Sequence, residues 1–160
     1  MKHLALVAVL AVLAAPAAAQ NAGQIARVQQ GSSCSGCNLF QADLGGLQAA
    51  GLNLSGSRLR QANLSLSVMN RTNFANTDLR DADGYGGVFS SANFSGANMT
   101  NASFVGAYLE GARFSGATLT GLNLSGAQLS RAIGLTQRQL DQACGDEATV
   151  LPGSLSIPRC

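Results

Sequence analysis

The sequence predicts an all-β solenoid, in which the chain bends every five residues and stacks on itself every twenty. The first observation behind this prediction is a repeated phrase between Ala92 and Leu129. A small residue, a polar residue, a large apolar residue and two turn-forming residues recur there at fixed spacing. A five-residue period fits neither the 3.6-residue repeat of a helix nor the two-residue repeat of a long strand. The repeat therefore determines the architecture before any local propensity is considered.

The second observation comes from comparing residues that are twenty positions apart, the length of one turn made of four five-residue sides. Residues of one kind then stack on each other in columns. One column contains Leu54, Phe74, Phe94 and Phe114, and another contains Leu39, Leu59, Leu79, Met99 and Leu119. Burial of such side chains stabilises a fold by about 1.5–3 kcal/mol each. Successive coils are expected to pair as parallel strands about 4.8 Å apart.

The repeated phrase resembles the A(D/N)LXX motif of pentapeptide-repeat proteins. Clear copies begin at Ala42, Ala62 and Ala92, and about nineteen consecutive five-residue units keep register between Cys37 and Ala132. The resemblance implies a right-handed quadrilateral parallel β-helix of nearly five coils. A disordered low-complexity segment is the alternative, and the strict apolar period argues against it.

Residues 1–19 have the features of a signal peptide. Basic residues precede an apolar stretch, residues 4–13, which is shorter than the ~20 residues that a membrane helix needs. Small residues at 17–19 provide a cleavage site before Gln20. We therefore expect an exported, periplasmic or secreted protein, with an uncleaved membrane anchor as the alternative.

Cleavage would remove Lys2 and His3, the only lysine and the only histidine of the chain, and would leave a formal charge of about +1. Histidine is the usual general base near neutral pH and the commonest metal ligand. Its loss predicts a protein that is not an enzyme and holds no cofactor or metal. A nearly neutral chain also gives no electrostatic reason to bind nucleic acid.

The flanks of the repeat are expected to close its ends, because terminal coils expose apolar side chains and unpaired strand edges. Residues 20–36 are predicted to be a linker or N-terminal cap with at most one loose helical turn. The repeat is assigned to residues 37–133, and residues 134–160 to a capping helix and tail. Thr136 and Gln139 fit a capping box, and Gly145 fits a helix stop.

One coil departs from the pattern, because Gly84 occupies a position where the other coils have a large side chain. A local groove with Tyr85 at its edge is one interpretation. The favoured interpretation is a thinned coil, in which Leu64 below and Phe104 above fill the missing volume.

Four cysteines in an exported chain predict disulfides. Two of the three possible pairings would join opposite ends of a stack about 24 Å long, at ~4.8 Å per coil, whereas a disulfide needs Cα atoms within about 7 Å. This leaves Cys34 with Cys37 and Cys144 with Cys160. The spacing of the first pair also matches redox and zinc motifs, but the helix context and the further ligands that such sites need are missing.

A candidate interaction surface lies where outward positions of adjacent coils carry apolar residues, a pattern that often marks a contact surface. Its members are Leu66, Val68, Tyr85, Val88, Val105 and Tyr108. The alternative is a surface whose apolar residues merely favour the β conformation.

The sequence thus favours a non-enzymatic structural or protein-interaction module of the bacterial periplasm or cell envelope, with an unknown protein partner or self-association. Some members of the family that the chain resembles mimic DNA and protect gyrase. Here five carboxylates face six arginines between Leu39 and Ala132, and export would separate the protein from gyrase. A carbohydrate-active β-helix is the third alternative, with Asp81 and Asp83 as the carboxylate pair that such chemistry requires.

Overall fold

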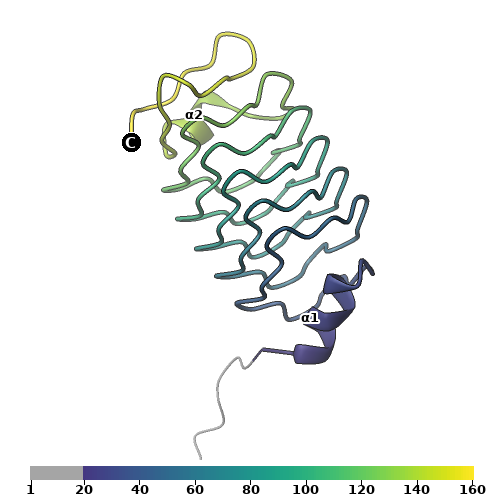
Figure 1. Ribbon diagram of the computed structural model, residues 1–160. Helices are drawn as coiled ribbons and strands as arrows, with labels where there is room; N and C mark the ends of the chain where they lie inside the picture. Colours follow the sequence, from purple (N-terminus) through teal and green to yellow (C-terminus); the bar gives the residue numbers. More distant parts are fainter. Residues whose placement is uncertain (1–19) are drawn as a thin grey trace, which may run out of the picture.

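The computed structural model describes residues 20–160 as a four-sided stack of coils with a helix at either end (Figure 1). Helix α1, Ala22–Gln29, lies against the first coil, and helix α2, Gln137–Leu140, lies at the last. The predicted signal peptide, residues 1–19, lies outside the described residues. Within residues 20–160, neither the length nor the hydropathy of any helix is sufficient for a membrane crossing.

Parallel bridges join residues that are twenty positions apart, and they form ladders along the stack. Asn53 pairs with Asn73 and Asn73 pairs with Asn93, for example. Each side of a coil consists of an extended segment around one bridge residue and is followed by a two-residue turn. The sides are therefore too short for continuous strands, and the sheet is a series of single bridges. The predicted twenty-residue stacking is confirmed.

The interior contains the large apolar side chains in the predicted columns. Phe94 stacks on Phe74 with ring centroids 5.0 Å apart, and on Phe114 with centroids 5.4 Å apart. Phe89 and Phe104 meet Phe94 edge to face at 6.1 Å and 5.9 Å. All five rings are fully buried. The aromatic column and its neighbours therefore form a continuous ladder through the middle of the stack.

Gly84 sits where the Phe104 ring fills the interior. A Cβ atom at Gly84 would lie 2.8 Å from two carbons of that ring. Gly87 is enclosed in the same way, since its Cβ would lie 2.4 Å from the Phe89 ring. The thinned-coil interpretation is therefore supported, because neighbouring phenylalanines occupy the volume that the glycines leave.

The N-terminal end is more regular than the sequence suggested. Helix α1 has eight residues, where at most one loose turn was expected. Asn21 caps it by accepting a hydrogen bond from the Gln24 N–H at 3.1 Å. Ile25 and Val28 are buried against the first coil, and the Gln24 side chain accepts a hydrogen bond from the Asn38 N–H at 2.7 Å. Packing against the solenoid thus stabilises a helix with only two apolar anchors.

At the C-terminal end, the predicted capping box of Thr136 and Gln139 is confirmed, and Leu140 is fully buried. The expected helix stop at Gly145 is wrong, because α2 already ends at Leu140. Cys144 instead extends a ladder by pairing with Asn123, and Gly145 pairs with Arg159 of the tail. Hydrogen bonding to the last coil therefore outweighs continuation of the helix.

Both predicted disulfides are present, with Cα separations of 5.6 Å for Cys34–Cys37 and 4.8 Å for Cys144–Cys160. Cys34 and Cys37 are buried, and the Ser57 hydroxyl joins them by donating to the Cys34 carbonyl at 2.8 Å and accepting the Cys37 N–H at 3.1 Å. This burial within the hydrogen-bonded first coil favours a structural crosslink over redox chemistry.

Two buried threonines offer a test of the interior. The Thr72 hydroxyl has no hydrogen-bond partner among the described residues, whereas the Thr77 hydroxyl donates to the Phe74 carbonyl at 2.7 Å. An unsatisfied buried hydroxyl costs about 1–3 kcal/mol. Thr72→Val should therefore raise the free energy of unfolding by about 1 kcal/mol, and Thr77→Val should lower it by about 1 kcal/mol. Urea titration of both variants checks the difference, and equal shifts would contradict it.

Candidate interaction surface

The six predicted surface residues lie on one corner of the stack and the face that follows it. We call this area, with the intervening turns, the apolar strip. Parallel bridges join Val68 to Val88 and Val88 to Tyr108, so these three form one outward column. Tyr85 and Val105 occupy the turn on adjacent coils, and the Gly86 N–H donates to the Val105 carbonyl at 2.9 Å. Leu66 lies in the turn one coil below.

Three side chains of the apolar strip are strongly exposed. The exposed fractions are 61% for Leu66, 55% for Tyr85 and 54% for Tyr108, whereas the valines are partly buried between them. Tyr85 and Tyr108 are the only tyrosines of the chain. Aromatic side chains are enriched at the centres of protein interfaces. The strip thus has the composition of a contact surface.

Leu66 has a backbone conformation that is unfavourable for leucine. Its φ is +56°, in the left-handed region, which costs a side chain with a Cβ roughly 1–2 kcal/mol. The equivalent turn residue is glycine on the other coils: Gly46, Gly86, Gly106 and Gly126. The remaining non-glycine residues with positive φ in residues 20–160 are all polar. Leu66 is therefore unfavourable in two ways, because it strains the turn and exposes apolar surface.

The Leu66 side chain reaches along the strip toward the next coil. A Cβ atom built on Gly86 would lie 3.0 Å from Leu66 Cδ2, so the Leu66 side chain packs closely over the Gly86 turn. The sequence pattern predicts Leu66 as part of the surface, but not its backbone strain or its contact with the Gly86 turn. A leucine at a turn position otherwise filled by glycine is the signal that could have revealed them.

The apolar strip carries no charged side chain on the coils between Gln48 and Gln128 in the described structure. These two glutamines lie at the two ends of the strip. Their side-chain amides donate hydrogen bonds to the Gly46 carbonyl at 3.4 Å and to the Gly126 carbonyl at 3.3 Å. Removing an uncharged surface from water costs little free energy, since no ion has to be desolvated. This favours its burial against another apolar surface.

The opposite face of the stack and its corner carry ion pairs instead. Arg80 binds Asp78 at 2.7 Å, and Arg60 binds Asp81 at 3.2 Å. The hydrogen bond from Arg80 is the main reason why the pKa of Asp78 lies below its usual range. Arg58 stacks over the Phe40 ring at 4.6 Å. Uncharged and charged surfaces are thus segregated on the solenoid.

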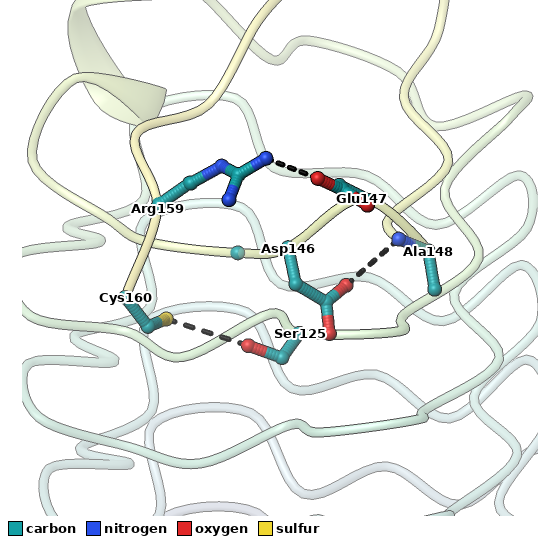
Figure 2. Close-up of a pocket in the computed structure, with 7 residues that line it drawn as sticks. Ser125, Asp146, Glu147, Ala148, Arg159 and Cys160 are labelled. Carbon is teal, nitrogen blue, oxygen red and sulfur yellow. Dashed lines mark hydrogen bonds and ion pairs between the residues drawn. The ribbon is translucent and has the colours of Figure 1, made fainter.

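An open hollow of ≈ 570 Å³ lies beside the C-terminal tail (Figure 2). The Asp146 carboxylate accepts the Gly126 N–H at 2.8 Å and the Ala148 N–H at 3.0 Å, and the bond from Gly126 is the main cause of its lowered pKa. Arg159 pairs with Glu147 across the hollow. These groups already satisfy one another, which indicates that they hold the tail rather than a ligand. Residues 20–160 contain no cluster of three or more histidine, cysteine or acidic residues that could hold a metal ion.

A family comparison matches the repeat region directly. The family described as Pentapeptide repeats matches residues 32–71, 50–83 and 97–133, in eight copies. These ranges cover more than half of the chain, including Leu66, Val68, Val105 and Tyr108 of the apolar strip but not Tyr85 and Val88. No curated protein sequence matches significantly.

Solved structures of similar shape come from the same group of proteins. A structure of QnrB1, a plasmid-mediated fluoroquinolone resistance protein, is 21% identical with a TM-score of 0.51, and the match covers 72% of this chain and 59% of QnrB1. A pentapeptide repeat protein from the cyanobacterium Cyanothece 51142 is 24% identical, with 81% and 97% coverage and a TM-score of 0.40. A thylakoid lumen protein from Arabidopsis thaliana is 27% identical, with 72% and 81% coverage and a TM-score of 0.36. The chain thus spans only about three fifths of the length of QnrB1, and this likeness shows the fold alone.

Proposed function

The chain belongs to the pentapeptide-repeat family, and we propose that it is a right-handed quadrilateral β-helix that serves as a protein-interaction module of the bacterial periplasm or cell envelope. It binds its partner through the apolar strip and catalyses no reaction. The observation that carries this proposal is the strained and exposed Leu66, with its φ of +56° and 61% exposure. A residue that is unfavourable in the isolated chain points to a function that requires it.

The carboxylates that a carbohydrate-active protein would use have structural contacts. Asp81 is paired with Arg60, and Asp83 accepts a hydrogen bond from the Tyr85 N–H at 2.9 Å. Glycoside hydrolysis needs one carboxyl group as an acid and a second as a base or nucleophile. The engagement of both groups supports a non-enzymatic role.

A DNA-mimicking role has less support than protein binding. A surface that imitates duplex DNA needs a regular excess of negative charge. Here the arginines slightly outnumber the carboxylates in the repeat region, and the two form pairs such as Arg80 with Asp78. The likeness to QnrB1 concerns the fold and carries no argument about its activity.

Leu66→Gly tests the proposal with little risk of unfolding the protein. Glycine relieves the left-handed strain, so stability should stay within about 1 kcal/mol of the parent. Recovery of crosslinked partners from the native envelope with a tagged protein should fall at least tenfold. The matched control is Arg71→Gly, because Arg71 also has positive φ but lies on another corner. Unchanged recovery with Leu66→Gly, or an equal fall with Arg71→Gly, would refute the proposed role of the strip.

A further inference from the structure

We propose that the partner of the apolar strip is a second copy of this chain, packed antiparallel about a two-fold axis that passes beside Val88. This inference rests on the proposed function in one respect, namely that the strip is a contact surface. It adds the identity of the partner and the register of the contact. The order of residues along the strip supports a second copy as the partner.

The middle column of the strip reads nearly the same in both directions. Parallel bridges set its order along the stack as Gln48, Val68, Val88, Tyr108 and Gln128. Consider two such faces in contact, related by a two-fold axis that lies between them and runs across the coils. The same columns then face each other with the coil order reversed. The Val88 side chains meet at the axis, Val68 faces Tyr108, and the terminal glutamines face each other.

The adjacent column of turn residues is also complementary in size when the same two-fold rotation is applied. Leu66 lies one coil below the axis and Gly106 lies one coil above it. A Cβ atom at Gly106 would meet no atom within 4 Å, so the surface there is open. The projecting Leu66 of each copy therefore faces the bare Gly106 turn of the other copy. Leucine at this one turn and glycine at its counterpart fit a self-complementary surface.

The tyrosines occupy suitable places in this arrangement. Tyr85 lies on the same coil as Val88, so the two copies of Tyr85 approach each other near the axis. Tyr85 and Tyr108 are both more than half exposed, and their hydroxyls have no hydrogen-bond partner within residues 20–160. Across the interface, each ring can bury its face while its hydroxyl stays at the rim. Tyrosines of this kind commonly supply the binding energy of an interface.

On two of the other faces of the stack, charge disfavours the same pairing. An axis through the same coil would bring the two copies of Asp83 together on one face that adjoins the strip, and the two copies of Asp78 together on the face opposite the strip. Like charges in direct opposition disfavour association. The apolar strip avoids this penalty, because none of its own residues is charged. Charge thus favours the strip over these two faces.

Sedimentation of the purified exported chain tests the proposal. The parent is expected to be a dimer at micromolar concentration, and Tyr108→Ser should raise the dissociation constant at least tenfold. Ile133→Ser is the control, because Ile133 is 52% exposed but lies outside the strip. Loss of dimerisation with Ile133→Ser, but not with Tyr108→Ser, would overturn the proposal.

Disulfide trapping tests the register. Val88→Cys alone should form an intermolecular crosslink under mild oxidation, because the two residues meet at the axis. Val68→Cys alone should not, whereas a mixture of Val68→Cys and Tyr108→Cys chains should. Crosslinking of Val68→Cys with itself would contradict the antiparallel order. Non-reducing electrophoresis reports all three results.

The two proposals fail in different ways. If the parent is monomeric at 100 µM but Leu66→Gly still loses an envelope partner, the second copy is wrong and the interaction surface stands. If the parent is monomeric and Leu66→Gly loses nothing, both are wrong. A dimer that Tyr108→Ser leaves intact would place self-association elsewhere and refute the inference.

Discussion

Phe94→Ala is expected to lower the free energy of unfolding by about 3–5 kcal/mol, the range for truncation of a large buried aromatic side chain. The Phe94 ring is fully buried and lies within 6.1 Å, centroid to centroid, of four other rings. Removal of the ring loses the free energy gained by transferring it from water to the interior. It also leaves a cavity, in which the neighbouring rings lose their contacts with Phe94. Urea titration followed by circular dichroism measures the change.

The matched control for this prediction is Phe40→Ala. Phe40 is partly exposed and packs beneath the Arg58 guanidinium on the outer surface. A cation–π contact at such a site contributes about 0.5–1 kcal/mol, so the control should lose much less than Phe94→Ala. Similar losses for the two variants would mean that the aromatic column does not support the stack.

Removal of the Cys144–Cys160 disulfide, as the double change to serine, is expected to lower the free energy of unfolding by about 3 kcal/mol. The disulfide closes a loop with a sequence separation of 16, and the chain-entropy treatment gives roughly 3 kcal/mol for a loop of this size. The tail should also lose protection locally. Hydrogen exchange at the Gly145 and Cys160 amides measures this, because Gly145 donates to the Pro158 carbonyl and Cys160 donates to the Gly145 carbonyl.

The Cys34–Cys37 pair provides the comparison. Its sequence separation is only 3, so the same treatment assigns it the smaller entropic contribution, about 2 kcal/mol. Its replacement by alanines should leave exchange at the C-terminal tail unchanged. If the tail amides stay protected without Cys144–Cys160, the hydrogen bonds to the last coil would hold the tail by themselves.

The sequence was sufficient to predict the solenoid and its columns, because each coil repeats the same spacing and errors of register would place polar residues inside. Both disulfides followed from the same stack, since its length separates Cys34 from Cys144. The grouping of Val68, Val88 and Tyr108 also followed directly from the twenty-residue offset. These features depend on periodicity, which a single sequence displays fully.

Features outside the period were predicted less well. Helix α1 contributes only Ile25 and Val28 to the interior, and its stability depends on contacts with a coil formed by later residues. Gly145 looked like a helix stop, but its hydrogen bonds to the tail decided its conformation. The backbone strain at Leu66 could not be predicted from the sequence, because the conformational propensity of leucine favours negative φ. The turn forces the left-handed region on whatever residue stands there.

The caps at the two ends of the stack restrict the ways in which the protein can assemble. Helix α1 and the Cys34–Cys37 pair cover the first coil, and α2 and the crosslinked tail cover the last. A solenoid with bare ends could add further chains end to end and grow into a fibre. With both ends closed, contacts through the apolar strip can only be lateral, and a two-fold contact of that kind uses up the surface that forms it. The proposed assembly would therefore stop at a dimer.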